Sequence, residues 1–555
     1  MERPYRVWKR ECERKCSLSG KKKINLSHIG RNPEEQFVTL SADEWIPLPC
    51  LHPTSESGPL INQPTEEQKA KSEYSLDGVC ALGLTRPANK EEEEKWVRRF
   101  LDGLRKLLSK GDNWTFYQPL LLSLESCAKC QLCSEACPAY LASGRQEIYR
   151  PTFRAEVLRR IIKKYLKKGG KTFAKVTGED IDLNWTTIAR LAELAYRCTL
   201  CRRCAQVCPM GVDNALISRE IRKLFSQELG IAPREIHEQG TVQQLKVGST
   251  TGMTPPALHD IVAFIEEEIK EKTGKDIKIP MDKTDADVLL LHNAGEFMSW
   301  PESIAAFAIL FDAANVNWTL SSELAGYDAV NYGVWYDDVQ LARVAVKHAE
   351  AARKLRVKKI NVGECGHAHK AFIVTADRVL TGDLNIPRES VFPLLEDLVM
   401  SDKIRLDPSR NNFPVTLHDP CNIVRLMGIV EPQRRILRKI CPQFVEMEPH
   451  GVDNYCCGGG SGFAIMNSRN FKDWKVHVSG RMKVKQILDA FRDVLDPKIK
   501  KYVCAPCSNC KGQIRDLIDT YHLGQDYSIR YGGLVELVVN AMADIEKPFI
   551  EWESF

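Results

Sequence analysis

The chain has few of the features that mark membrane-spanning or secreted proteins. Its longest uninterrupted apolar run, Ile304–Phe311, is far shorter than the roughly 20 residues that a membrane-spanning helix needs. The segment Met1–Cys16 is crowded with charged residues and has no apolar core, which argues against a secretory signal. We therefore expect a cytoplasmic protein that reaches a membrane only through a partner.

Phosphate-binding glycine motifs and a strong charge bias are also missing. There is no G-x-x-x-x-G-K-[ST] loop and no G-x-G-x-x-G after a predicted strand, so the sequence gives no support for bound nucleotide, flavin or nicotinamide. The net charge is +5, from 78 basic and 73 acidic residues. The most basic stretch, 159–168, is predicted as the solvated face of an amphipathic helix. We expect no nucleic-acid partner, because such a partner requires basic residues gathered on one face.

Cysteine is what the sequence does contain. Twenty cysteines in 555 residues are too sparse for a disulfide scaffold, in which more than about 8–10% would be expected. In a chain without a secretory signal, clustered thiols indicate metal or redox chemistry instead.

Two cysteine runs have the same spacing, C-x2-C-x2-C-x3-C-P, at 127–138 and 198–209. This spacing is typical of cubane [4Fe–4S] clusters, and in two-cluster proteins the fourth cysteine of one run serves the other cluster. A zinc site would need four ligands in total, whereas each run supplies four by itself. The ligands predicted for the two cubanes are Cys127, Cys130, Cys133 and Cys208 for the first, and Cys198, Cys201, Cys204 and Cys137 for the second.

The hydrophobic pattern predicts a multidomain α plus α/β fold. Alternating strand-like and helical segments after residue 285 repeat in the same order, which implies two parallel sheets with right-handed crossovers. The predicted divisions are an extended N-terminal arm (1–95), an α-helical two-cluster ferredoxin-like domain (96–235), a connector (236–285), and two half-domains (286–400 and 401–555).

Most of the remaining cysteines fall in the second half-domain. Cys421 follows a predicted strand, the pair Cys456-Cys457 precedes three glycines, and Cys504-x-x-Cys507 follows another strand. All three segments lie just beyond the carboxyl ends of parallel strands, which is the edge where open α/β sheets build their sites. Glycines at such an edge would let the backbone approach a bulky cluster closely.

This second pattern resembles the cysteine-rich CCG domain of heterodisulfide reductases, and its fusion to a two-cubane module resembles the HdrD-like proteins of that family. The resemblance covers about residues 95–540. It implies a non-cubane [4Fe–4S] cluster that cleaves a disulfide or trisulfide directly, and it implies that Cys510 lies beside this cluster without binding it. The ligands implied by the resemblance are Cys421, Cys456, Cys457, Cys504 and Cys507.

The first half-domain lacks most of these thiols. When the two repeats are aligned, Gly295 stands in place of Cys421, and Asn331-Tyr332-Gly333 stands in place of the segment 456–458. Too few thiols remain to hold a cluster, so a single catalytic cluster is expected. The first half would then shape the substrate pocket. Candidate handlers of protons or sulfur there are Cys365, His367 and His369.

The segment 363–369, Gly-Glu-Cys-Gly-His-Ala-His, further resembles the DsrK subunits of DsrMKJOP membrane complexes. This resemblance implies a quinone pool that is reached through an integral membrane haem-b subunit (DsrM-like), together with other complex subunits of dissimilatory sulfur metabolism. It also implies a DsrC-like protein substrate with two cysteines on a flexible C-terminal arm. The chain would then attach to the inner face of the cell membrane through a partner, and the direction of electron flow stays open.

Two other functions remain open. Iron–sulfur subunits of glycolate, lactate and glycerol-3-phosphate dehydrogenases combine the same two modules and only transfer electrons to or from a flavoprotein. A zinc-binding scaffold is the second alternative. Among the other residues, His418 is predicted as a hydrogen-bonded histidine or a proton donor, and Cys441 as a buried core thiol. Structural or incidental roles are favoured over a further metal site for Cys12, Cys16, Cys50 and Cys80.

Overall fold

The computed structural model describes residues 39–40, 74–75, 87–143, 145, 147–233, 235–243, 249–324, 336–463, 465–466, 471 and 474–552. Most of the predicted N-terminal arm lies outside these residues, as do Asn331-Tyr332-Gly333 and the four cysteines Cys12, Cys16, Cys50 and Cys80. Two short strands of the arm, β1 (Thr39–Leu40) and β2 (Tyr74–Ser75), pair in antiparallel register. None of the helices in the described ranges combines the length and the apolar character that crossing a membrane requires.

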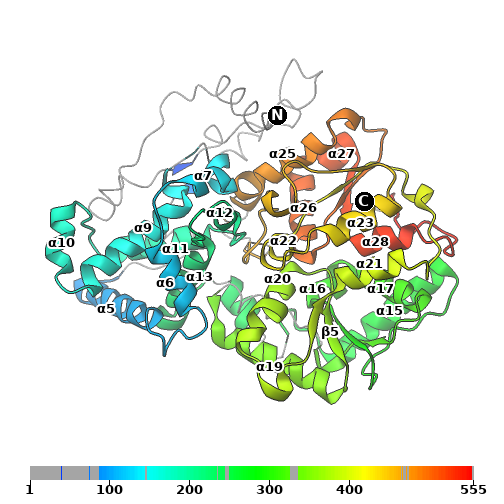
Figure 1. Ribbon diagram of the computed structural model, residues 1–555, viewed down its shortest axis with the longest axis horizontal. Helices are drawn as coiled ribbons and strands as arrows, with labels where there is room; N and C mark the ends of the chain where they lie inside the picture. The colour runs from blue at the N-terminus through cyan, green and yellow to red at the C-terminus, as the bar shows by residue number, and fades with distance from the viewer. Residues whose placement is uncertain are drawn as a thin grey trace.

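A helical domain carries the two cysteine runs and lies to one side of the molecule (Figure 1). Its long helices form where apolar residues recur at helical spacing, and the first is capped by Asn89, whose side chain accepts a hydrogen bond from the backbone of Glu92. Two of the helices, α9 and α13, continue into π-helical turns, η4 (Ile162–Leu166) and η5 (Phe225–Leu229). The longer helices are α5 (Lys90–Leu107), α6 (Tyr117–Glu125), α9 (Pro151–Ile161), α10 (Gly170–Thr177), α11 (Trp185–Tyr196) and α13 (Asn214–Leu224).

The rest of the chain forms two four-stranded parallel sheets with the same strand order, β4-β3-β5-β6 and β8-β7-β9-β10. This equivalence confirms the predicted α plus α/β architecture with an internal repeat. The final strand of each sheet, β6 and β10, has no counterpart in the sequence prediction. The strands are β3 (Val288–Leu291), β4 (Trp318–Thr319), β5 (Lys359–Val362), β6 (Arg388–Ser390), β7 (Val415–Leu417), β8 (Phe444–Val445), β9 (Lys501–Cys504) and β10 (Ile529–Gly532).

Helices cover the sheets and join them through one apolar core (Figure 1). Phe307 on α17 and Leu395 on α21, from the first half, share this core with Leu437 on α23 and Val538 on α28, from the second. Burying side chains of this size contributes about 1.5–3 kcal/mol each, so the two halves stabilise one another. The helices are α15 (Pro255–Thr273), α16 (Ala294–Ser299), α17 (Pro301–Ala313), α19 (Asp338–Lys354), α20 (Gly366–His369), α21 (Val391–Met400), α22 (Cys421–Leu426), α23 (Glu431–Ile440), α25 (Arg481–Ala490), α26 (Ser508–Thr520), α27 (Leu523–Tyr527) and α28 (Leu534–Asn540).

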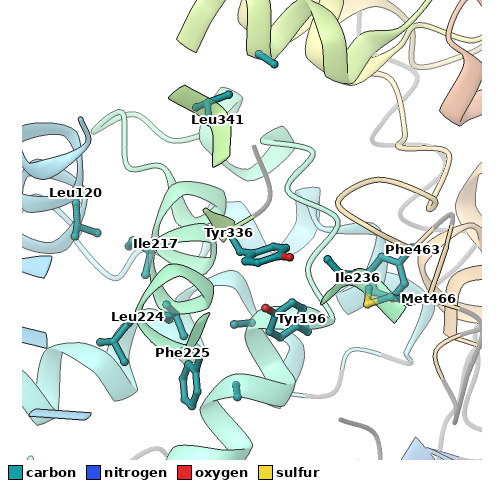
Figure 2. Packing of buried hydrophobic residues seen from close by; sticks show 14 of the residues in the cluster. Leu120, Tyr196, Ile217, Leu224, Phe225, Ile236, Tyr336, Leu341, Phe463 and Met466 are labelled. Carbon is teal, nitrogen blue, oxygen red and sulfur yellow. The ribbon is translucent and has the colours of Figure 1, made fainter. Parts of the chain in front are cut away.

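A second core is shared by the helical domain and both half-domains (Figure 2). Ile217 and Phe225 come from the helical domain, Tyr336 from the first half and Phe463 from the second. A buried guanidinium reinforces this junction. Arg222 on α13 donates hydrogen bonds to the carbonyl of Cys198 at 2.5 Å and to the carbonyl of Ser461 at 3.0 Å. The cysteine run of one domain is thereby fixed against the glycine-rich loop of another.

The three glycines after Cys457 allow that loop to pack closely against protein atoms. Gly458 has φ +94°, and a Cβ at this position would lie 2.4 Å from the backbone nitrogen of Gly480. A Cβ at Gly460 would lie 2.7 Å from the carbonyl oxygen of Thr199, inside the second cysteine run. The sequence predicts that these glycines admit a cluster. In the structure, protein atoms of other segments lie so close to these glycines that a side chain would not fit.

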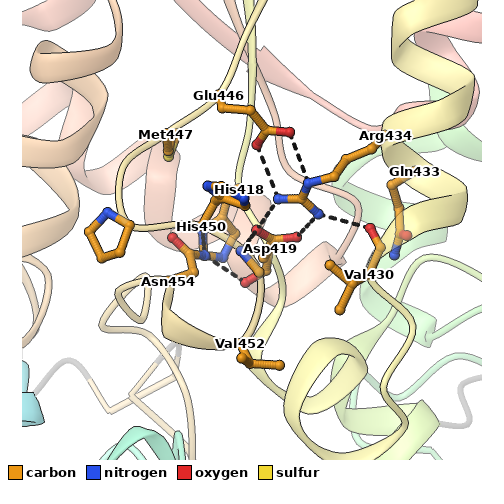
Figure 3. A network of polar contacts seen from close by, with 12 residues as sticks. His418, Asp419, Val430, Gln433, Arg434, Glu446, Met447, His450, Val452 and Asn454 are labelled. Carbon is orange, nitrogen blue, oxygen red and sulfur yellow. Dashed lines mark hydrogen bonds and ion pairs between the residues drawn. The ribbon is translucent and has the colours of Figure 1, made fainter. Parts of the chain in front are cut away.

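A polar network holds the segment His418–Cys421 in place at the end of β7 (Figure 3). Arg434 on α23 donates to both carboxylate oxygens of Asp419, at 2.8 and 2.7 Å, and both side chains are almost fully buried. The Gly451 backbone N–H donates to the same carboxylate at 2.6 Å, and the Asn454 side chain donates to the Asp419 carbonyl at 2.9 Å. The network therefore fixes the loop before Cys421 relative to the loop before Cys456.

Replacing Gly460 by alanine tests the close approach at the domain junction. The new methyl group must displace the Thr199 carbonyl, so we expect Gly460→Ala to lower the free energy of unfolding by about 1–3 kcal/mol. Gly111→Ala is a matched control, because a Cβ there meets nothing nearer than Ser109 Oγ at 3.9 Å. Thermal unfolding of the iron-loaded protein measures both variants, and equal melting temperatures for the two would contradict the packing described.

Removing the charge of Arg434 tests the buried ion pair. Arg434→Met leaves the Asp419 carboxylate buried without its guanidinium partner. We therefore expect the free energy of unfolding to fall by about 3–5 kcal/mol. The double variant Arg434→Met/Asp419→Asn should recover part of this loss, because the buried negative charge is gone.

The control for this pair is Arg356→Met. Arg356 pairs with Asp285 at 2.5 Å, but both side chains are more than 60% exposed, so less than about 1 kcal/mol is expected. Denaturant unfolding compares the three variants. A double variant less stable than Arg434→Met would show that the charge pairing is not what matters at this position.

Candidate iron–sulfur centres

The two cysteine runs share one backbone conformation. Lys129 and Gln131 in the first run have φ of +55° and +66°, and Leu200 and Arg202 at the matching positions of the second run have φ of +52° and +61°. Left-handed conformations are uncommon for residues other than glycine. Their recurrence at the same two positions turns each run tightly, so that its thiols converge.

The first group of thiols combines three cysteines of the first run with the last cysteine of the second. Burial, with smaller contributions from the neighbouring thiols Cys127, Cys137, Cys208 and Cys130, raises the pKa of the Cys133 thiol to about 12. Cys208 is therefore close to the first run although 75 residues separate it from Cys133 in the sequence. Cys130 is exposed, whereas the other seven cysteines of the two runs are partly or fully buried.

The second group combines three cysteines of the second run with Cys137 of the first. Burial raises the pKa of Cys137 to about 11, an effect opposed by the Tyr140 backbone N–H and the Arg154 charge and strengthened by Cys201 and Cys198. One cavity is lined by all four thiols of this group and by four arginines. These are Cys137, Cys198, Cys201 and Cys204, with Arg154, Arg197, Arg202 and Arg203.

These two groups fit cubane [4Fe–4S] clusters. A cubane held by four thiolates carries net negative charge, and a cavity walled by four thiols and four guanidinium groups suits both its ligands and its charge. The grouping, with Cys208 beside the first run and Cys137 beside the second, is the one that exchange of the fourth cysteine requires.

A third group of thiols lies at the carboxyl edge of the second sheet. Cys421 begins α22, Cys507 is the N-cap residue of α26, and Cys510 lies in the first turn of α26. The sulfur atoms of Cys457 and Cys510 are 3.5 Å apart. The Cys421 thiol contributes to the raised pKa of Cys456, and the Cys510 thiol is the largest cause of the lowered pKa of Cys507, so these thiols are also neighbours. One ring nitrogen of His418 and the sulfurs of Cys457 and Cys510 lie within 4.8 Å of one another.

The positions of Cys504 and Cys510 correct the sequence prediction. The sequence predicts Cys504 in the third group and Cys510 outside it, whereas the structure places them the other way round. Successive side chains of a strand point to opposite faces. In β9, Val503 shares a core with Cys457, whereas Cys504 faces the other core, beside Cys441. Cys510 joins the group because α26 turns back over the strand end.

The second and third groups are in direct contact. The Cys201 and Cys456 thiols lie next to each other, and Cys456 is the largest cause of the raised pKa of Cys201. Arg425 on α22 bridges the same two loops, because it donates to the Cys201 carbonyl and to the Val452 carbonyl, each at 2.8 Å. Arg203 donates to the Asp453 carbonyl at 2.8 Å. The three groups therefore lie in a series that starts at the exposed Cys130 and ends at the sheet edge.

The first half-domain forms a wall of the third group. The Gly366 backbone N–H donates to the sulfur of Cys507 at 3.2 Å, and the Asn293 side chain donates to the sulfur of Cys365 at 3.6 Å. Burial, followed by the nearby Cys507, raises the pKa of Cys365 to about 12. His367 accepts a hydrogen bond from the Ser461 backbone at 3.4 Å, and burial lowers its pKa to about 4.

Three other residues singled out from the sequence, His369, Cys441 and His418, are buried. The two ring nitrogens of His369 contact the Cys365 carbonyl and the Ser390 hydroxyl, each at 2.8 Å, and burial lowers its pKa to about 4. Cys441 is buried in the core between the sheets, as predicted. His418 is fully buried, and burial lowers its pKa.

Sequence reasoning did not identify two polar side chains near the third group. Lys483 on α25 is fully buried and donates to Asn454 Oδ1 at 2.8 Å, and burial lowers its pKa to about 7 despite the opposing charges of Asp419 and Cys457. Asn293 donates to Ser508 Oγ at 2.9 Å, across the two half-domains. Neither lies in a cysteine motif, so only the repeat alignment at 291–295 could have drawn attention to Asn293.

Comparison with known proteins identifies two domains that contain these cysteines. A 4Fe-4S dicluster domain matches residues 123–212, and a cysteine-rich domain of the CCG type matches residues 415–515. The chain is 26% identical over 488 residues to an Hdr-like menaquinol oxidoreductase iron-sulfur subunit 2 of Archaeoglobus fulgidus, covering 81% of this chain and 84% of the relative.

Two further relatives extend the comparison. The chain is 27% identical over 403 residues to a subunit of the dihydromethanophenazine:CoB–CoM heterodisulfide reductase of Methanosarcina acetivorans, covering 71% and 89% of the two chains. It is 24% identical over 373 residues to a probable membrane-anchored ferredoxin of Chromohalobacter salexigens, covering 64% and 53%. The chain thus combines a 4Fe-4S dicluster domain with a cysteine-rich domain of the CCG type, and over most of its length it is similar to subunits of Hdr-like menaquinol oxidoreductases and heterodisulfide reductases.

Proposed function

We propose that this subunit carries single electrons through two cubane [4Fe–4S] clusters to a non-cubane [4Fe–4S] cluster, where a disulfide or trisulfide is reduced or formed. The observation that carries the proposal is the series of three thiol groups, the last two of which are in contact through Cys201 and Cys456. Because the third group lies at the carboxyl edge of a parallel sheet, a substrate can approach it there.

Each thiol group supplies one ligand set. The third set replaces Cys504 with Cys510, because Cys510 contacts Cys457 and Cys507 whereas Cys504 faces the core between the sheets. A cluster held there supplies the redox chemistry. The proposed sets are Cys127, Cys130, Cys133 and Cys208 for the first cubane; Cys198, Cys201, Cys204 and Cys137 for the second; and Cys421, Cys456, Cys457, Cys507 and Cys510 for the third cluster.

The chain's own residues position these sets relative to one another. Cys130 at the surface gives a partner access to the first group, since electron exchange between proteins requires close approach of their centres. Arg425 holds the Cys201 loop against the Val452 loop and thereby keeps the second and third groups in contact. Cys365 and His367 of the first half lie beside the third group and are the residues that would handle protons or sulfur in the pocket.

The names of two relatives support the proposed partners. One relative is named as a menaquinol oxidoreductase subunit and another as a subunit of a heterodisulfide reductase. Together with the DsrK-like segment 363–369, these names support a subunit that exchanges electrons with a quinone pool through a DsrM-like membrane haem-b protein. The proposed sulfur substrate is a DsrC-like protein, and the proposed location is the inner face of the cell membrane, through that partner.

Iron content tests the ligand sets. Three [4Fe–4S] clusters correspond to about 12 iron atoms per chain. We expect about 12 in the anaerobically purified wild-type protein and about 8 in Cys510→Ser, because that variant loses a ligand of the third cluster. Cys504→Ser is the matched control, a buried cysteine in the same segment, and should retain about 12. Loss of iron from Cys504→Ser alone would overturn the proposed third set.

A thiol titration followed by electron paramagnetic resonance tests whether the third centre reacts with substrate. If it does, the oxidised protein should give a signal that changes when a dithiol substrate binds, and Cys510→Ser should lack this signal. A subunit that only passes electrons to or from a flavoprotein would show the reduced cubane signals and no thiol-dependent change. That outcome would assign the chain to the electron-transfer class instead.

A further inference from the structure

The cavity of the second thiol group has an unusual charge environment. Four arginines line it, and two of them are paired with carboxylates: Arg197 with Glu193 at 2.6 Å and Arg202 with Asp213 at 2.7 Å. These two pairs are close to neutral.

The other two arginines of the cavity, Arg154 and Arg203, are each only 5% exposed, and no carboxylate of the described residues lies within 4.0 Å of either. Arg154 donates to Ser218 Oγ at 2.5 Å. Arg203 donates to the carbonyl oxygens of Ala136 and Asp453, at 2.7 and 2.8 Å. Their hydrogen bonds are satisfied by neutral groups, so their positive charges remain uncompensated.

A third buried guanidinium reaches the same group from the cysteine-rich domain. Arg425 donates to the carbonyl of Cys201 and to the carbonyls of Val452 and Asn454. It too forms no ion pair within the described part of the chain. Arg222 on α13 donates to the Cys198 carbonyl and likewise has no carboxylate partner among the described residues. Four uncompensated positive charges therefore lie around the second group, on α9, α12 (Arg203–Gln206), α13 and α22.

Reduction of a cubane adds one electron, so a buried group that is already negatively charged gains one more negative charge. Nearby positive charge in a poorly solvated interior stabilises that state, and net charge and solvent exposure are among the factors that set cluster potentials. We propose that Arg154, Arg203 and Arg425 raise the reduction potential of the second cubane, so that an electron is held beside the third centre. This inference rests on the proposed function only in requiring that the two cubanes are bound.

The first group offers a contrast. Cys130 is exposed, so water screens charge there more strongly. Lys129, inside the first run, is paired with Glu156 at 3.1 Å and with Glu179 at 3.5 Å. Breaking a sulfur–sulfur bond into two thiols takes two electrons and two protons. A second cubane that retains one electron could supply it at once when another arrives from the first.

The test is a redox titration of the iron-loaded full chain, followed by electron paramagnetic resonance of the reduced cubanes. Arg203→Gln keeps donors for the two carbonyls but loses the charge, and Arg154→Gln is an independent second variant. Each variant should change the equilibrium constant for electron transfer between the two cubanes at least tenfold in favour of the first cubane. A tenfold change corresponds to a difference of 59 mV in reduction potential for a one-electron couple. The reduction potential of the second cubane should fall, and that of the first should stay unchanged.

Two controls separate charge from structure. Arg203→Lys keeps the positive charge with a different shape and should retain most of the wild-type potential. Lys129→Gln removes a compensated, half-exposed charge beside the first run and should leave the second cubane unchanged.

If Arg203→Gln and Arg154→Gln load two cubanes and leave both potentials unchanged, or shift both equally, the inference is overturned while the proposed function stands. A wild-type chain without two cubanes would overturn both.

Discussion

The contact between the second cysteine run and the cysteine-rich half-domain is the interaction on which the rest of the structure depends. The Cys201 and Cys456 thiols touch, Gly460 lies against the Thr199 carbonyl, and Arg425 joins the two loops through backbone carbonyls. Electron transfer between buried centres requires them to be near and fixed. This junction provides both conditions, because the Gly460 and Arg425 contacts use backbone atoms that have little freedom to move.

The junction also explains why the chain retains two half-domains although only the second one gathers thiols. The first half shares one apolar core with the second and another with the helical domain. Its segment 363–369 presents the Gly366 N–H to Cys507 and places His367 against the loop that contains Ser461. A half-domain with Cys365 as its single cysteine thus supports the edge where the thiols of the other half meet.

Much of this architecture could be predicted from the sequence, because it depends on local periodicity. The two parallel sheets form after residue 285, as the alternating pattern predicts, and the repeated spacing of the two cysteine runs indicates which thiols come together. The short strands β6 and β10 escape prediction, since three or four residues carry little periodic signal. The pattern predicts Arg159 and Arg160 as solvated, but both are buried: Arg160 pairs with Glu156 on the same helix, and Arg159 donates to the backbone carbonyls of Leu124 and Ser123. The place of Cys510 depends on which face of β9 each side chain takes, which cysteine spacing alone does not reveal.

The most direct measurement is an anomalous density map at the iron absorption edge, from crystals of anaerobically purified protein. The account predicts three iron centres in series, with the last one bounded by Cys507 and Cys510 and with Cys504 apart from it, in the core between the sheets. A sheet edge without iron, or with those cysteines joined to each other as disulfides, would contradict it and leave a chain that only conducts electrons.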